Sequence, residues 1–149
     1  DPNGYLQLAG FYNRTGNFES TIEQLQARAR VEPDNPEAYY TISTFYWEKA
    51  FRDFRITQEQ KAEYVTAGLN AADQAIGLNA RYVDALVYKN ILLRMQAGML
   101  VCEDTDDTEC ISQQEGLIAQ ADELRNTAQD IEAEARGAAL AAATAAEGN

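Results

Sequence analysis

The chain of 149 residues contains no histidine, and only 12 lysines and arginines stand against 24 acidic residues. Histidine is the commonest general base of enzymes and a frequent metal ligand, so its absence removes the usual basis for both roles. The sequence also lacks a glycine-rich phosphate loop, a nucleophile elbow and a dinucleotide fingerprint. It therefore predicts a protein that is not an enzyme and that uses no cofactor and no metal.

Long apolar runs are missing as well, since no segment approaches the roughly 20 apolar residues that span a bilayer. We therefore expect no membrane span. The sequence begins at Asp1 rather than methionine and shows no signal peptide, so we expect a processed mature product or a trimmed sequence. All three prolines lie within the first 36 residues, which leaves the rest free for helices and argues against an all-β protein.

Basic residues are scarce only in the last third of the chain. Residues 1–102 hold 12 acids and 10 bases, whereas residues 103–149 hold 12 acids and two bases, so most of the net charge of −12 lies there. Nucleic acids and anionic membranes need clustered lysine and arginine, so neither is predicted as a partner. A solvated acidic face explains this charge, and a site for a basic partner or a cation is the alternative.

Periodicity and helix-breaking residues predict an all-α protein. We expect helices over residues 3–14, 18–31, 36–54, 58–78, 81–100 and 112–146. The sequences Thr57–Gln60 and Ser112–Glu115 are typical of capping boxes that open the fourth and the last helix. Alanine has the highest helix propensity, so the last helix should continue past Gly137 and reach about 50 Å.

The first half of the chain repeats with a period of 34 residues. The pattern has fixed positions for large, small, turn and closing residues. In the first unit these positions are occupied by Tyr5, Leu8, Tyr12, Gly16, Phe18, Leu25 and Pro33. A second unit starts at Pro36 and repeats the first three as Tyr39, Ile42 and Tyr46. A third start, residues 82–86, comes 13 residues late, because Pro33 and Ala80 are 47 residues apart. On these residues the chain resembles the tetratricopeptide repeat family over roughly residues 2–98.

The resemblance implies a solenoid of helical hairpins that binds proteins and rarely catalyses. We expect a single domain over residues 1–149, with about three irregular repeats and a long C-terminal helix. The predicted units are a first repeat (2–35), a second repeat with an insertion (36–82) and an atypical third hairpin (83–146). The departures from the family pattern are Thr21 and Arg28 in place of small alanines, Ala80 in place of the closing proline, and the polar Lys89 and Asn90.

The last predicted helix carries a heptad pattern. One column is Leu117, Leu124, Ile131 and Ala138, and the other is Ala121, Ala128, Ala135 and Ala142. Together the columns form a seam typical of a coiled coil over four heptads. The half before Ile131 can pack against the preceding helix of the same chain. For the rest, from Ile131 through Ala135, Ala138 and Ala142, we expect contact with another molecule.

Aromatic residues crowd the third predicted helix and its end, at Tyr39, Tyr40, Phe45, Tyr46, Trp47, Phe51 and Phe54. Consecutive helical residues point about 100° apart, so one buried face cannot cover them all. Either this helix is central and has neighbours on two sides, or part of its aromatic surface belongs to a groove or subunit contact. The candidate interface residues in the second case are Tyr40, Trp47, Phe51 and Phe54.

Cys102 and Cys110 bracket an acidic segment. Zinc needs three or four ligands, so we expect a disulfide, with two free thiols as the alternative. A disulfide implies export from the cytoplasm, to the cell surface, the medium or the periplasm. The acids of the segment, Asp104, Asp106, Asp107 and Glu109, could gather calcium, but the glycine turn and distant glutamate of an EF-hand are missing, which favours solvated side chains.

Two hypotheses of function remain, and both are non-enzymatic. In the first, the chain is a self-assembling extracellular structural subunit whose first and last helices join copies into a homopolymer or filament. In the second, it is a monomeric adaptor that binds a peptide or helix of another protein. The length of the last helix favours the first hypothesis, so we expect other copies of the same chain as partners.

Overall fold

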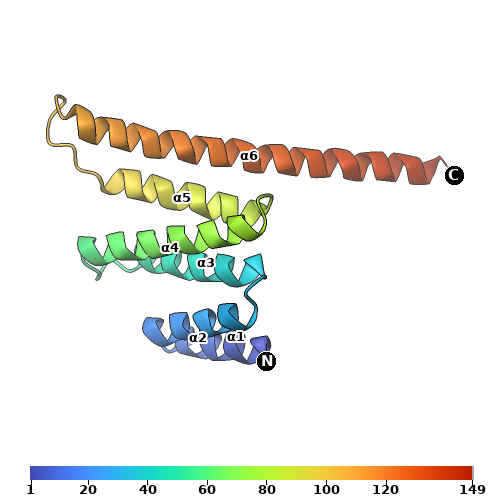
Figure 1. Ribbon diagram of the computed structural model, residues 1–149, viewed down its shortest axis with the longest axis horizontal. Coiled ribbons are helices and arrows are strands. Elements are labelled where there is room, and N and C mark those ends of the chain that lie inside the picture. Colours follow the sequence, from blue (N-terminus) through green and yellow to red (C-terminus); the bar gives the residue numbers. More distant parts are fainter. Residues whose placement is uncertain (149) are drawn as a thin grey trace.

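The computed structural model describes residues 1–148, which form six α-helices and no strand (Figure 1). The helices are α1 (Pro2–Arg14), α2 (Phe18–Val31), α3 (Pro36–Arg52), α4 (Gln58–Leu78), α5 (Val83–Met99) and α6 (Thr108–Glu147). The predicted all-α class is therefore confirmed. Apart from the start of α6, every helix end lies within two residues of its predicted position.

Side-chain caps explain where the first four helices begin. The Asp1 carboxylate accepts a hydrogen bond from the backbone N–H of Asn3, and the side chains of Asn17 and Asn35 cap α2 and α3 in the same way. The capping box predicted for α4 is present. Thr57 Oγ1 accepts from the Gln60 N–H at 3.0 Å, and Gln60 Oε1 accepts from the Thr57 N–H at 2.9 Å.

The second predicted capping box, Ser112–Glu115, is wrong. The helix α6 already begins at Thr108, and the Asp107 side chain caps it by accepting a hydrogen bond from the Cys110 N–H at 3.2 Å. Aspartate caps a helix as well as serine does, and Asp107 comes first along the chain. Ser112 consequently lies inside a helix of 40 residues, which is about 60 Å long and continues through Gly137.

The helices are stacked in successive layers, from α1 and α2 at one end to α5 and α6 at the other (Figure 1). Consecutive helices pack against each other, and α3 also contacts α5. The first buried cluster centres on Leu25 and Ile42 and joins α1, α2 and α3, with Ala71 of α4 added. The second centres on Leu92 and joins α3 and α4 to Ala121 of α6. These two clusters hold the stack together and position α6 along α5.

Candidate functional site

The helix α6 has a packed half and a free half. Ala121 and Ala128 are buried against α5, while Leu117 and Leu124 are half-buried and contact the second core cluster. From residue 132 to residue 147 every position is exposed, and Figure 1 shows this stretch running past the ends of α4 and α5. We call residues 132–147 the free segment. By the rise of 1.5 Å per residue it is about 24 Å long.

Three polar contacts join α6 to the rest of the chain, two in its packed half and one at the start of the free segment. The Gln114 side chain donates to the Ala97 carbonyl at 2.9 Å, near the start of the helix. In the middle, the Arg94 guanidinium pairs with Asp122. The Arg81 guanidinium pairs with Glu134 and is the last such contact. Within residues 1–148, no hydrogen bond or ion pair joins a side chain beyond this point to another helix, so the rest of the free segment stands alone.

The predicted interface residues of α6 lie on both sides of this boundary. Ile131 is half-buried where the helix leaves α5, and Ala135, Ala138 and Ala142 are exposed on the continuation of the same face. One large apolar residue of the free segment, Leu140, is 70% exposed. At 100° per residue it lies on the opposite face. The seam therefore presents small side chains that another helix can approach closely.

Three aromatic residues of α3, Tyr40, Trp47 and Phe51, belong to a row that continues to α5. The ring centroids follow the order Tyr82, Tyr40, Tyr88, Trp47 and Phe51, with successive distances of 5.5, 5.4, 5.5 and 5.3 Å. Such edge-to-face and stacked pairs are each worth about 0.5–1.5 kcal/mol beyond the area they bury. Tyr40 and Trp47 are thus engaged within the chain rather than in an open groove.

Phe51 and Phe54, the other two aromatic candidates, are exposed by 64% and 94%. The residues that the sequence did not single out are Tyr82 and Tyr88, which supply the α5 side of the row. The late repeat start at residues 82–86 was a signal that these tyrosines lie near α3. Of the four candidates, Tyr40 and Trp47 therefore lie inside the row, Phe51 forms its exposed end by stacking on Trp47, and Phe54 is exposed beyond α3.

The pH dependence of stability follows from this row. Burial, with help from the Asp84 carboxylate, raises the pKa of Tyr40 to about 12. Tyrosines of the unfolded chain ionise near pH 10. The unfolded state therefore loses its proton first, and stability falls as the pH rises from about 10 to 12. We expect tyrosinate absorbance in the folded protein to show a late transition that Tyr40→Phe reduces, because the pKa values of Tyr46 and Tyr82 are also raised by burial. A single transition of all eight tyrosines near pH 10 would contradict this.

A hollow of about 400 Å³ lies where the end of α3 meets the turn between α1 and α2. Its lining includes three phenylalanines (Phe18, Phe45 and Phe54) and three bases (Lys49, Arg52 and Arg55). Lys49 and Arg55 both pair with Asp53, at 2.7 and 2.9 Å, and Arg55 is the main reason why the pKa of that carboxyl is well below its usual range. Arg52 pairs with Glu48 at 3.4 Å. Each base is therefore paired, but the two carboxylates leave one net positive charge in the hollow.

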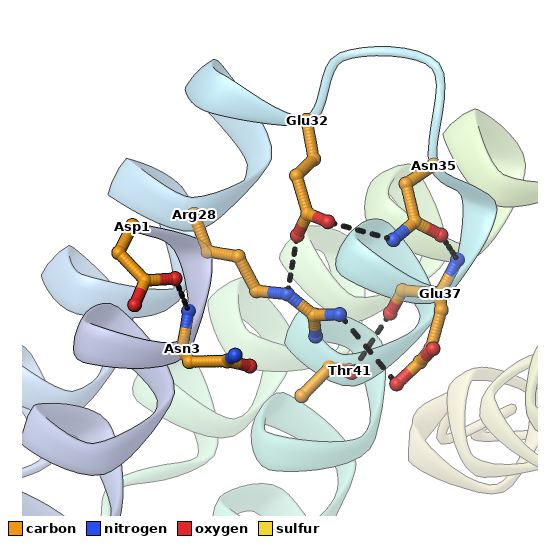
Figure 2. A network of polar contacts seen from close by, with 7 residues as sticks. All are labelled: Asp1, Asn3, Arg28, Glu32, Asn35, Glu37 and Thr41. Atoms are coloured by element: carbon orange, nitrogen blue, oxygen red, sulfur yellow. Dashed lines mark hydrogen bonds and ion pairs between the residues drawn. The ribbon is translucent and has the colours of Figure 1, made fainter.

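Arg28 holds the turn between α2 and α3, as Figure 2 shows. It is 5% exposed, and its Nε donates to Glu32 at 2.7 Å while Nη2 lies 3.6 Å from Glu37. The hydrogen bond from Arg28 lowers the pKa of Glu32. The Asn35 side chain donates to Glu32 at 3.3 Å and also caps α3 by accepting from the Glu37 N–H at 3.0 Å. The arginine thus anchors a polar network that links α2 and α3.

Cys102 and Cys110 form a disulfide, with Cα atoms 5.6 Å apart, so the predicted pairing is confirmed. Closing such a short loop contributes about 2–3 kcal/mol in the chain-entropy account. In residues 1–148 the structure brings no three acidic or cysteine side chains into a metal-binding group. No helix in the same range is both long and apolar enough to cross a membrane.

Fold and surfaces together define an all-α protein whose last helix extends beyond its packed body. Comparison with protein-family models, with curated proteins and with solved structures gives no match. The function has to be inferred from the geometry of the chain itself.

Proposed function

We propose that the chain is a structural subunit that self-assembles through the free segment of α6. The observation that carries this proposal is the exposure of every residue from 132 to 147 in a stretch that still has a regular helical seam. An isolated helix of this length is marginal in water, because most helical stability in proteins comes from packing of one face. A neighbouring copy that covers the seam supplies this packing.

The remaining surfaces support the same proposal. Tyr40 and Trp47, two of the candidate interface residues, already contact Tyr88 of α5 within the chain. The 34-residue period and the stacked helices support a tetratricopeptide-like solenoid, a fold that holds proteins together. The disulfide supports a location outside the cytoplasm, where such bonds persist. We infer an extracellular or periplasmic homopolymer.

An adaptor remains the second candidate, and the hollow at the end of α3 is the observation that favours it. Phe54 is 94% exposed beside three bases, as in a site for an acidic peptide. However, each of these bases is already paired with Asp53 or Glu48. A peptide carboxylate would have to displace existing ion pairs, so we rank this function below self-assembly.

A charge placed in the seam tests the proposal. We expect the native chain to self-associate in light scattering and Ala138→Glu to abolish this association, because a buried unpaired carboxylate is costly. Ala133→Glu is the matched control, since Ala133 is exposed on the opposite face of the same helix and should leave association unchanged. Equal behaviour of the two variants would show that the seam is not the contact.

A further inference from the structure

The outer face of α1 carries apolar residues that residues 1–148 cover only in part. Leu8 is 46% exposed and Phe11 is 52% exposed. Gly4 lies one turn before Leu8, and a Cβ built on it would meet no atom within 4 Å. The three residues are spaced by four and three, so they share one face of the helix. We call them the α1 stripe.

The repeat inside the chain shows what covers the equivalent stripe of α3. One period of 34 residues later, Gly4, Leu8 and Phe11 correspond to Ala38, Ile42 and Phe45. Ala38 is fully buried and Ile42 is 6% exposed, and both belong with Phe45 to the cluster that α2 shares. In α3, the three equivalent residues therefore pack against a neighbouring helix. The α1 stripe has the same chemistry but no such neighbour within residues 1–148.

We propose that the α1 stripe of one copy receives the free segment of a second copy, which makes the assembly head-to-tail. This inference rests on the proposed function and names the surface that the free segment contacts. The dimensions agree, because α1 has 13 residues, or about 20 Å, and the free segment spans about 24 Å. The shapes also agree, since the large side chains of Leu8 and Phe11 face a column of alanines.

The charges of the helices favour α1, rather than a second α6, as the partner of the free segment. The free segment contains three acids and one base, so pairing two free segments brings like net charges together. The helix α1, by contrast, contains no acidic residue and one base, Arg14. An acidic helix can therefore lie on α1 without like-charge repulsion within the helix pair. The resulting contact joins two different surfaces, and such a contact forms a ring or an open filament.

Two blocked variants, mixed together, test this pairing. We expect Leu8→Glu, which blocks the acceptor, and Ala138→Glu, which blocks the donor, each to give the molar mass of one chain. An equimolar mixture should give a complex of two chains and nothing larger, because one donor and one acceptor remain intact. Phe11→Glu should behave as Leu8→Glu does. Asn3→Glu, a charge on an exposed part of α1 away from the stripe, should associate like the native chain.

The outcomes separate this inference from the function on which it rests. If the native chain has the mass of one chain at every concentration, self-assembly itself is wrong. If Leu8→Glu and Phe11→Glu associate like the native chain while Ala138→Glu does not, the free segment acts elsewhere and the α1 stripe is not its acceptor. If both blocked variants are single chains and their mixture is too, the two surfaces are not partners.

Discussion

We expect Leu92→Ala to lower the free energy of unfolding by about 2–5 kcal/mol, the range typical of a leucine truncated in a packed core. Leu92 is fully buried at the point where α5 meets α4 and α6. A Cβ on Gly68 would lie 3.1 Å from Leu92 Cδ1, so the leucine fills the space that this glycine leaves. Ala121 on the other side is also small. Neither neighbour has a side chain that can move into the cavity, so the cavity persists.

Chemical denaturation of dilute, monomeric protein measures this loss. We expect the denaturant concentration at half-unfolding to fall, while the dependence of the free energy of unfolding on denaturant concentration stays unchanged. Leu140→Ala is the matched control, because it makes the same substitution at a leucine that is 70% exposed. Surface substitutions of this kind change stability by less than about 0.5 kcal/mol. Similar losses for both variants would mean that the second core cluster does not have the packing described above.

Ending the chain after Ile131 should abolish self-association and leave the fold intact. The residues removed up to residue 147 are exposed, and within residues 1–148 only the surface ion pair between Arg81 and Glu134 ties them to another helix. Such pairs contribute at most about 1 kcal/mol. We expect the thermal midpoint of the truncated chain to stay close to that of the monomeric native chain. Its light scattering should correspond to one chain at concentrations where the native protein assembles.

A shorter copy that ends after Gly116 is the contrasting case. It lacks Leu117, Ala121 and Leu124, so it exposes Leu92 and the face of α5 that α6 covers. This copy should lose stability strongly, because a buried apolar face becomes solvated. If truncation after Ile131 destabilised the chain as much as truncation after Gly116, the free segment would be part of the folded body rather than an interaction surface.

Local signals in the sequence predicted most of the fold. Helix starts follow from side chains that act within a few residues, such as Thr57 with Gln60, and such signals need no knowledge of the rest of the chain. The heptad seam likewise indicated which face of α6 meets α5, and Ala121 and Ala128 are buried there. The start of α6 was mispredicted because Asp107 and Ser112 are both good caps, and sequence alone does not rank them.

Contacts between distant residues could not be predicted in the same way. Arg28 is buried at a position where the repeat pattern calls for alanine, and only the packing of α2 on α3 brings Glu37 close to it. The pairing of Tyr40 with Tyr88 likewise depends on how α5 lies against α3. For this reason the sequence made Tyr40 and Trp47 candidate interface residues, whereas the structure places both in an internal row.

The molar mass of the full-length chain, followed by light scattering over rising concentration with negative-stain microscopy of the same samples, tests the central claim most directly. If the chain self-assembles through α6, its molar mass should grow beyond that of one chain, and the microscope should show rings or filaments of regular repeat. A constant mass of one chain throughout, with single particles in every image, would contradict self-assembly through α6.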